Sequence, residues 1–302
     1  MILIITHKED YTSDFIINKL NQRNIKYKRL NCEDIIENIF TVDKNLNFTF
    51  DGETSFTSVW FRRTKLPNIE HQNITEKLYL LNEYEALLKN LFFTINAKWV
   101  SDPYSIYQAE NKLYQLKIAS DLGFKIPNTL VTNSKENLKK FYFENSKNVI
   151  IKPLSQSKIN NDNETEFIFT NILKEEHINQ IDVYDLTPCI YQERIEKAIE
   201  LRVTVVGENV FSAGVNSQTL ETTKTDWRKD KLEFFIEDVP TKIKEKCILL
   251  VKNLNLKFGA IDLIKDKNDN YIFLEINPNG QWAWIENETG LKISDSIINL
   301  LL

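Results

Sequence analysis

Short apolar runs and amphipathic stretches alternate at the start of the chain. Residues 2–5 (ILII) have the pattern of a buried strand, and residues 12–24 have the spacing of an amphipathic helix, with Thr12 or Ser13 as its N-cap. A second strand is predicted within residues 26–35. A strand, a helix and a second strand in this order predict a small parallel sheet.

The following stretch carries the signals of a hairpin and two helices. Two runs of alternating polarity flank Asp51 and Gly52, a dipeptide that favours a tight turn between antiparallel strands. Apolar residues at helical spacing predict a long helix over about 71–96 and another over 105–121, which Gly123 ends.

The rest of the chain mixes paired strands with two further helices. Strands and helices without regular alternation favour an α+β fold over a doubly wound sheet. The expected elements are paired strands in 148–154 and 166–172, further strands in 189–215, a helix over 241–256, a hairpin in 258–279 and a last helix from about 293.

Composition narrows the class of protein. With 302 residues, of which 42% are hydrophobic and 27% charged, the chain is long enough for two or three closely packed subdomains. The net charge of −5 gives no support for nucleic-acid binding, and no apolar stretch reaches the length of a membrane span. No GxGxxG motif occurs and only seven glycines are present, so dinucleotide binding by that signature is not expected.

Two further features bear on the compartment. Cys32, Cys189 and Cys247 are far apart in the chain and are expected to be reduced thiols. The N-terminal apolar run is short and no basic segment precedes it, so a first strand is expected there rather than a signal peptide. We therefore expect a soluble, cytoplasmic protein.

Two acids and an amide are predicted to meet on one face of the last hairpin. Side chains alternate along a strand, so Glu275 and Asn277 point to the same side. If a four-residue loop closes the hairpin at 267–270, the register places Asp262 opposite Glu275, about 5 Å away. Three oxygen-donor side chains would then share one patch of the sheet.

Such a patch requires a cation. Facing carboxylates in an apolar sheet repel each other unless a positive charge lies between them. Oxygen ligands without His or Cys point to Mg²⁺ or Mn²⁺, and Mg²⁺ usually shares its coordination shell with substrate phosphates. The three histidines are isolated and give no zinc spacing. The alternative is that Asp262 ends a strand and that Asn277 and Pro278 begin a turn.

Basic residues elsewhere are candidates to hold phosphates. Lys152 ends an apolar strand, where its ammonium group can enter a cleft, and Lys112 lies on an amphipathic helix. Glu200 and Arg202 are two residues apart and share a strand face; a carboxylate accepts ribose hydroxyls, and a guanidinium fits a phosphate. The alternative for these residues is a solvated surface, where an ion pair contributes little.

This ordered series resembles the ATP-grasp superfamily. The series contains a helical lysine, a strand-end Lys-Pro, the apolar hinge "QERI", then Glu, Arg, Asp and finally Glu-x-Asn, and it spans residues 100–302. The resemblance implies an α+β ATP-grasp fold with ATP held between the last two of three subdomains. The implied divisions are an N-terminal α/β subdomain at 1–100, a central subdomain at 101–190 and a C-terminal subdomain with the metal site at 191–302.

The resemblance also implies a role for each matching residue. The segment after Lys152 (PLSQSKINND) has no glycine, unlike the phosphate-covering loop of many ATP-grasp enzymes, so its backbone contacts are not assigned. The implied roles are phosphate binding by Lys112 and Lys152, adenine recognition by the backbone of Glu193, Arg194 and Ile195, ribose binding by Glu200, binding of the transferred phosphate by Arg202, and Mg²⁺ binding by Asp262, Glu275 and Asn277.

Within the superfamily, the segments "EINPNGQWAWIE", "ELRVTVVG", "TDWRK" and "VWFRR" look most like the microviridin-type ligases, or graspetide synthetases, which are related to RimK-like glutamate ligases. That group phosphorylates Asp or Glu side chains of a ribosomally made precursor peptide. Attack by a Thr or Ser hydroxyl then gives an ω-ester, and attack by Lys gives an ω-amide. The resemblance therefore implies ATP and Mg²⁺ as cofactors and a precursor peptide, with leader and core, as partner. Such enzymes often form homodimers, although no sequence feature here marks an interface.

Further residues are implied to contact the peptide or assist the chemistry. Each has a structural alternative: an exposed charged turn for residues 223–230, a solvated strand end for the two arginines and a core position for the tryptophan. The implied peptide contacts are Arg62, Arg63, Trp227, Arg228 and Trp282, with Arg228 also acting on the acyl phosphate and Asp226 assisting deprotonation of the hydroxyl.

Two other functions remain open from the sequence. A RimK-like ligase that adds free amino acids to a protein would share the ATP and metal residues. A peptide-binding module with a degenerate nucleotide site would explain the missing glycines after Lys152, but the intact series of charged residues argues against it.

Overall fold

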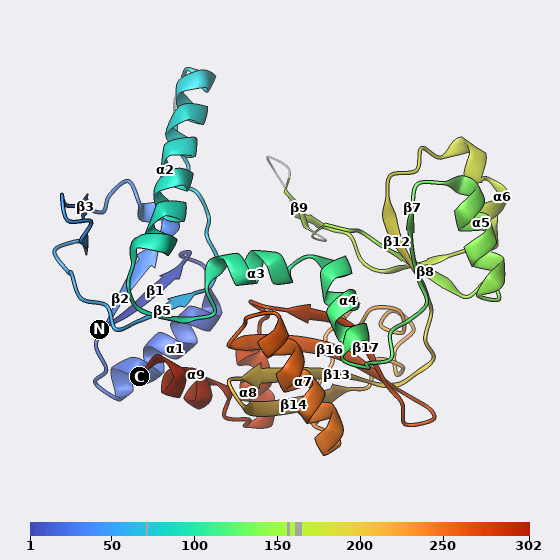
Figure 1. Cartoon of the computed structure of the whole chain (residues 1–302). Coiled ribbons are helices and arrows are strands. Elements are labelled where there is room, and N and C mark those ends of the chain that lie inside the picture. The colour runs from blue at the N-terminus through green and yellow to red at the C-terminus, as the bar shows by residue number, and fades with distance from the viewer. Residues whose placement is uncertain (71, 156–157, 161–164) are drawn as a thin grey trace.

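The computed structural model describes residues 1–302 except 71, 156–157 and 161–164. Three sheets of four, four and five strands organise this part of the chain, and helices cover them (Figure 1). The predicted α+β class is confirmed. Within the described residues, no helix is both long and apolar enough to cross a membrane.

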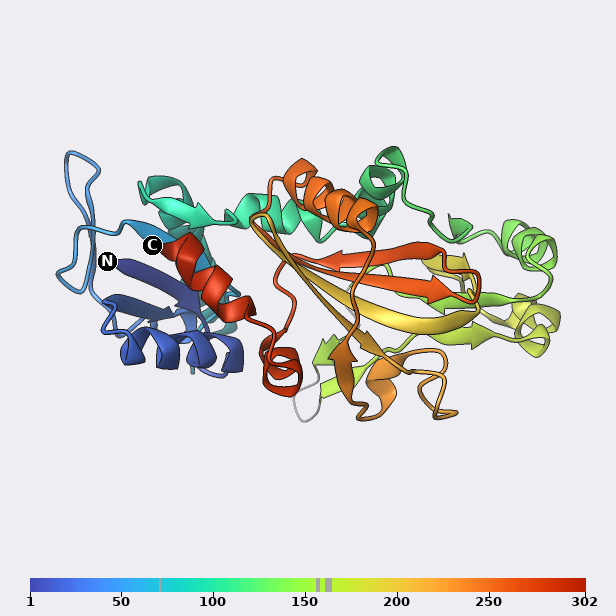
Figure 2. The same cartoon turned by 90° about the horizontal axis from the view of Figure 1, so that it is seen from below.

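The N-terminal sheet is parallel and has the strand order β2-β1-β5-β6. It includes the predicted β-α-β opening, with Asp10 rather than Thr12 or Ser13 as the N-cap of α1. The C-terminal helix α9 lies against this sheet, where Ser58 donates a hydrogen bond to the Leu301 carbonyl at 2.6 Å (Figure 2). The elements are β1 (Ile2–Thr6), α1 (Tyr11–Gln22), β2 (Tyr27–Asn31), β5 (Ser58–Phe61), α2 (Ile74–Thr94), β6 (Lys98–Val100) and α9 (Ile293–Leu301).

The turn at Asp51 and Gly52 forms, but the predicted hairpin does not extend from it. Both residues have positive φ, 44° and 82°, and the turn closes with a bridge between Phe50 and Glu53. The strand before it, β4 (Phe48–Phe50), pairs instead with β3 (Phe40–Val42). The run after it becomes β5, every residue of which is buried, because a strand inside a parallel sheet is covered on both faces.

The second sheet is antiparallel and has the order β11-β8-β12-β7. The predicted pairing of 148–154 with 166–172 is right for β8 and β11, but residues 165–167 pair with 158–160 in a separate two-stranded sheet. The glycine-free segment after Lys152 falls partly outside the described residues. The elements are β7 (Thr129–Thr132), α5 (Lys135–Glu144), β8 (Val149–Lys152), β9 (Lys158–Asn160), β10 (Thr165–Phe167), β11 (Asn171–Leu173), α6 (Glu175–Asn179) and β12 (Cys189–Glu193).

The third sheet is antiparallel and has the order β15-β14-β13-β16-β17. Helix α7 packs on one face of it, and α4 lies along β17. The elements are α3 (Pro103–Ala109), α4 (Lys112–Asp121), β13 (Lys197–Val206), β14 (Asn209–Val215), β15 (Phe234–Ile236), α7 (Thr241–Asn253), β16 (Phe258–Asp266), β17 (Tyr271–Asn277) and α8 (Ala283–Thr289).

The helix predicted over 105–121 is in fact two helices, α3 and α4. Side-chain amides satisfy carbonyl groups where α3 ends: Asn111 Nδ2 donates to Tyr107 O at 3.1 Å and to Gln108 O at 3.0 Å. Gln115 Nε2 donates to Ala109 O at 2.5 Å. As a result, Lys112 is the first residue of α4 rather than a residue in the middle of one long helix.

The β16–β17 hairpin brings Asp262 opposite Glu275 as predicted, but by another route. Position 265 pairs with 271, which lengthens the loop by one residue, and a β-bulge at Leu274 restores the expected register. The bulge also changes which face of the strand is buried. Phe273 therefore packs in the core, whereas Glu275 and Asn277 face the cleft described below.

The predicted subdomain boundaries lie close to the divisions between the three sheets. Position 100 ends β6, whereas position 190 falls inside β12, which pairs with β7 and β8 in the second sheet. The division into 1–100, 101–190 and 191–302 remains a prediction.

Candidate active site

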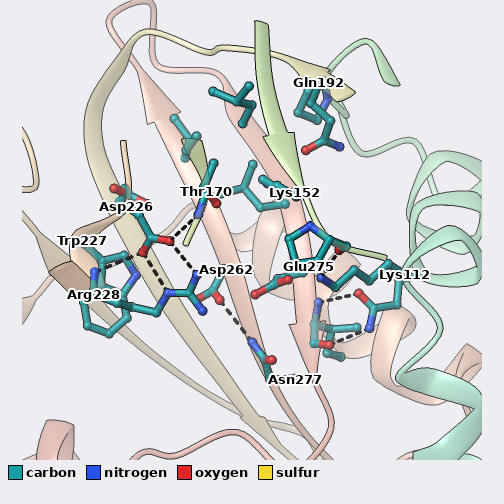
Figure 3. Close-up of a pocket in the computed structure, with 18 of the residues that line it drawn as sticks. Lys112, Lys152, Thr170, Gln192, Asp226, Trp227, Arg228, Asp262, Glu275 and Asn277 are labelled. Atoms are coloured by element: carbon teal, nitrogen blue, oxygen red, sulfur yellow. Dashed lines mark hydrogen bonds and ion pairs between the residues drawn. The ribbon is translucent and has the colours of Figure 1, made fainter. Parts of the chain in front are cut away.

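A cleft of about 800 Å³ lies between the second and third sheets. Its volume is within the range of roughly 300–1,000 Å³ that is typical of ligand sites. All of the residues that the sequence assigned to the site line this cleft except Arg62 and Trp282. Figure 3 labels ten of the lining residues, which come from both sheets, from α4, from the segment before β11 and from the loop before β15.

The acidic end of the cleft is formed by adjacent strands of the third sheet. Asn277 Nδ2 donates to Asp262 Oδ2 at 3.2 Å, and Glu275 lies beside them (Figure 3). On the other side, Arg202 Nη1 lies 2.8 Å from both carboxylate oxygens of Asp262. The three predicted metal ligands are therefore close together, and an arginine neutralises one of them.

The charge balance at this end fits a divalent cation. Burial raises the pKa of Asp262 to about 6; the Arg202 guanidinium opposes this rise, and the negative charge of Glu275 adds to it. A cation between the carboxylates would remove their repulsion. Among the described residues, no group of three or more His, Cys, Asp and Glu could hold a metal. A metal here would therefore need the Asn277 amide oxygen as its third protein ligand, and carboxylate and amide oxygens suit Mg²⁺.

Two lysines face this acidic end from the opposite side of the cleft. Lys112 Nζ donates to the Pro153 carbonyl at 2.8 Å and to the Ser155 carbonyl at 3.2 Å. Lys152 Nζ makes no hydrogen bond or ion pair with the described part of the chain. Burial lowers the pKa of both ammonium groups, and Glu275 opposes this effect. A bound phosphate would supply a negatively charged partner for these two buried ammonium groups.

At its other end the cleft offers hydrogen-bonding groups for a flat heterocycle. Asn148 holds the Arg194 peptide, because Arg194 N donates to Asn148 O at 2.9 Å and Asn148 Nδ2 donates to Arg194 O at 2.8 Å. The next N–H, that of Ile195, has no hydrogen-bond partner in the described residues. Gln192 is buried, and its Oε1 also lacks a partner. One free donor and one free acceptor are what an aminopurine edge requires.

Between these two ends, Glu200 is held by a lysine that the sequence analysis did not select. Lys197 Nζ donates to Glu200 Oε1 at 2.8 Å and to the Thr225 carbonyl at 3.1 Å. Both side chains are about nine-tenths buried. The second oxygen of Glu200 remains available for a ligand hydroxyl.

The loop before β15 places a strong ion pair at the cleft. Arg228 donates to both carboxylate oxygens of Asp226, from Nε at 2.8 Å and from Nη2 at 2.6 Å. Asp226 Oδ2 also accepts the Thr170 N–H at 3.3 Å, which links the loop to the second sheet (Figure 3). Burial acts to raise the pKa of Asp226, but the hydrogen bonds and charge of Arg228 outweigh it and lower that pKa. A carboxylate in this state is a weak base.

The tryptophan and arginine positions assigned to peptide binding differ in location. Trp227 lines the cleft and packs edge-on against Phe234, with ring centroids 5.1 Å apart. Arg63 is exposed at the cleft. Arg62, by contrast, is buried directly after β5 of the N-terminal sheet, where its Nε donates to Asp10 Oδ2 at 3.3 Å.

Trp282 also lies in the core rather than in the cleft wall. Its side chain is fully buried and meets Phe15 of α1 edge-on, with centroids 5.8 Å apart. In this structure neither Arg62 nor Trp282 can touch a ligand in the cleft, and both stabilise the N-terminal part of the chain instead. The role assigned to them from the sequence has no geometric support.

Sequence reasoning missed four residues that shape the site: Gln192, Lys197, Asn148 and Gln115. Gln192 is the first residue of the hinge motif and lies in β12, so the motif itself was a usable signal for it. Lys197 lies three residues before Glu200, but nothing in the sequence revealed that its ammonium group turns back to that carboxylate. Asn148 and Gln115 act through backbone groups of distant segments, and no local pattern predicts such contacts.

The fold and this arrangement of charges identify the class of protein. A model of the RimK-like ATP-grasp domain matches residues 109–301. The chain belongs to the RimK-like ATP-grasp family, and the predicted ATP-grasp fold is confirmed. The protein is an ATP-grasp ligase.

Individual relatives place the chain more narrowly. A RiPP-associated ATP-grasp ligase from Chryseobacterium gregarium, in complex with ADP and a leader and core peptide, matches with a TM-score of 0.87 and 30% identity, covering 99% of this chain and 96% of that one. The macrocyclase MdnC from Microcystis aeruginosa, bound with precursor peptide MdnA, matches with a TM-score of 0.86 and 28% identity, covering 100% and 99%. The predicted similarity to microviridin-type ligases is confirmed.

A sequence relative points to another branch of the family. The α-aminoadipate–LysW ligase LysX from Sulfurisphaera tokodaii is 25% identical over 225 residues, which is 70% of this chain and 74% of that protein.

Proposed function

We propose that this protein is an ATP-dependent peptide macrocyclase. It would phosphorylate Asp or Glu side chains of a ribosomally made precursor peptide and close ω-ester bonds to Thr or Ser, or ω-amide bonds to Lys. One observation carries the proposal: the cleft with its lysines, arginines and acidic end occurs in a chain that is 30% identical, over 99% of its length, to a RiPP-associated ligase in complex with leader and core peptide.

The contacts in the cleft support one orientation of ATP. The Ile195 N–H and Gln192 Oε1 suit the adenine edge, with the Glu193–Ile195 segment alongside, and the free oxygen of Glu200 suits a ribose hydroxyl. The phosphates would then extend toward Lys112 and Lys152.

The acidic end would hold Mg²⁺ through Asp262, Glu275 and Asn277. A divalent cation there neutralises charge on the transferring phosphoryl group and orients it. Arg202, with its unpaired Nε atom, and Lys152 would bind the phosphoryl oxygens from the other side. The same oxygen ligands also admit Mn²⁺.

The proposed reaction has two steps, phosphorylation of a carboxylate and closure of the ring. A carboxylate oxygen of the peptide attacks the γ-phosphorus, the bond to ADP breaks, and an acyl phosphate forms. A peptide hydroxyl or amine then attacks the acyl carbon, loses its proton and expels inorganic phosphate. Each ring therefore uses one ATP and removes the elements of one water. Enclosure of the cleft protects the acyl phosphate from hydrolysis.

Arg228 is the residue we assign to the acyl phosphate, because it lines the cleft and stays cationic. The pKa of its guanidinium is raised above its usual value, chiefly by its hydrogen bonds to Asp226. We assign Asp226 to holding Arg228 in place, since a carboxylate with a lowered pKa accepts a proton poorly. Arg63 and Trp227 are proposed to contact the peptide. Formation of a homodimer and the division into three subdomains remain predictions.

The test is to express the chain together with the short reading frames encoded beside it and to analyse each peptide by mass spectrometry. We expect a loss of one water per ring, and ADP formation that depends on both peptide and Mg²⁺. Glu275→Gln should abolish both; full ring formation by this variant would overturn the metal assignment.

Two outcomes would favour other functions. A mass gain that requires a free amino acid would indicate a ligase that extends a protein, which the similarity to LysX keeps open. Purified protein that binds no ATP in the presence of Mg²⁺ would indicate a binding module.

A further inference from the structure

A buried glutamine holds the peptide unit between two of the proposed metal ligands. Gln115, on α4, is 3% exposed. Its Nε2 donates to the Ile276 carbonyl at 2.8 Å, and its Oε1 accepts the Ile276 N–H at 3.1 Å. Ile276 lies between Glu275 and Asn277, so both peptide groups of this residue are fixed at the acidic end of the cleft.

The position of β17 in its sheet explains the contact. β17 is the last strand in the order of the third sheet, and a strand at the edge of a sheet presents unpaired N–H and C=O groups. A glutamine amide has the same donor and acceptor as a peptide group. Gln115 therefore pairs with Ile276 as a residue of a neighbouring strand would.

The orientation of the Gln115 amide is fully determined. The second hydrogen of Nε2 goes to the Ala109 carbonyl at the end of α3, at 2.5 Å. A flipped amide would place its oxygen against two carbonyl oxygens and its NH₂ group against the Ile276 N–H. The side chain can therefore hold Ile276 in one position only.

The same helix turn also carries a proposed phosphate-binding group. Lys112 is the first residue of α4, three positions before Gln115, and it faces the cleft opposite Glu275. The backbone of α4 thus connects a cation on one side of the cleft with the acidic strand end on the other. A shift of β17 relative to α4 would change the spacing between them.

We infer that Gln115 is a positioning residue for the metal site, acting through the Ile276 peptide on the placement of Glu275 and Asn277. The inference rests on the proposed function, because it assumes that Mg²⁺ and a nucleotide bind here. Residues that orient metal ligands commonly contribute about 10- to 100-fold to metal affinity.

The test uses two variants and one matched control. Gln115→Glu keeps the shape and the acceptor but loses both donated hydrogen bonds, and Gln115→Leu loses all three. Leu116→Ala is the control, since Leu116 is the next residue of α4 and is buried in the core, but its apolar side chain makes no hydrogen bond to Ile276. ADP binding to the full chain is measured by calorimetry as a function of Mg²⁺ concentration, and hydrogen exchange of the 271–277 segment is followed without ligand.

We expect Gln115→Glu to raise the Mg²⁺ concentration for half-maximal ADP binding about tenfold or more, while ADP affinity at saturating Mg²⁺ is kept. Gln115→Leu should also accelerate exchange of the Ile276 amide in the ligand-free protein. Leu116→Ala should lower the melting temperature but change neither the Mg²⁺ dependence of ADP binding nor the exchange of the Ile276 amide.

Other results distinguish failure of the positioning role from failure of the proposed function. Unchanged Mg²⁺ dependence in Gln115→Glu, or an equal change in Leu116→Ala, would overturn the positioning role while the proposed function stands. Absence of Mg²⁺-dependent ADP binding by the unaltered chain would overturn the proposed function itself. If Gln115→Leu does not fold, Gln115→Glu still decides.

Discussion

At the scale of single residues, the site depends on how buried charges are balanced. Asp262 is paired with Arg202, and Asp226 with Arg228, whereas Lys152 has no partner in the described residues. The sequence indicated Asp262 and Arg202 through strand alternation and spacing, whereas it indicated Asp226 and Arg228 only through the resemblance to microviridin-type ligases. It could not predict which charges pair, because the partners of Asp226, for example, depend on how a loop folds back to the second sheet.

Substitutions can distinguish whether Asp226 holds Arg228 in place or acts as a general base. Asp226→Asn should slow ring closure by about 10- to 100-fold, since Arg228 loses its anchor, while ADP affinity is kept. Arg228→Gln should give a similar loss. The double variant should be little worse than either single variant, because both remove the same interaction. Losses that multiply in the double variant, measured as kcat, would contradict this coupling.

A second buried ion pair, Asp10 and Arg62, makes the stability of the fold depend on the ionisation of Asp10. Burial acts against the charged form of Asp10, but Arg62 and hydrogen bonds from Ser13 and Thr6 outweigh it and lower the pKa of this carboxyl to about 2. The folded-state pKa is below the unfolded one, so the stabilisation is present above about pH 4 and is lost as the pH falls through about 2.

Asp10→Asn should therefore reduce the free energy of unfolding at neutral pH by about 3–5 kcal/mol, because Arg62 is left buried without its partner. Denaturant titrations of both proteins should show this difference shrinking by about 2 kcal/mol between about pH 6 and about pH 2. A difference that stays constant over this range would show that ionisation of Asp10 is not its source.

At the scale of elements, close approaches between strands and turns position the acidic end of the cleft. The turn after β17 brings Gly280 against β16, and a Cβ at this position would lie 2.5 Å from the Ala260 Cβ and 3.2 Å from the Asn277 carbonyl oxygen. Only glycine fits without moving the turn, and Asn277 is part of that turn.

Gly280→Ala should cost about 1–3 kcal/mol of stability by overpacking and should weaken Mg²⁺-dependent ADP binding. Gly52→Ala is a matched control: no atom lies within 4 Å of its added Cβ, but its φ of 82° strains an alanine. It should lose about 1–2 kcal/mol and leave ADP binding unchanged. Urea unfolding and calorimetry measure both; equal ADP binding by the two variants would contradict a role for Gly280 at the site.

The elements also show what local patterns predict. The β-α-β opening, the helices over 74–94 and 241–253 and the last helix follow apolar periodicity and were predictable. The turn at Asp51 formed for the expected reason, but the partner of the strand after it depends on burial in a parallel sheet. The bulge at Leu274 was not predictable either, because the apolar run around it is compatible with two strand registers.

At the scale of the whole molecule, contacts between distant segments hold the three sheets around the cleft. Lys112 on α4 reaches the end of β8, and Asp226 in the third sheet's loop reaches Thr170 beside β11. At the far side, Glu286 accepts hydrogen bonds from Lys19 of α1 at 2.6 Å and from the Ser294 N–H at 2.7 Å, which joins the C-terminal helices to the N-terminal sheet. The ordered series of charged residues indicated the ATP-grasp class, but these long-range contacts had no signature in the sequence.

In the proposed reaction, peptide carboxylates are activated as acyl phosphates before ring closure. The most direct measurement uses a precursor peptide whose Asp and Glu carboxyl groups carry heavy oxygen, incubated with the enzyme, ATP and Mg²⁺ in ordinary water. We expect each ring to transfer one heavy oxygen to inorganic phosphate, because phosphate leaves with an oxygen of the former carboxylate. Ring formation accompanied by unlabelled phosphate would contradict it.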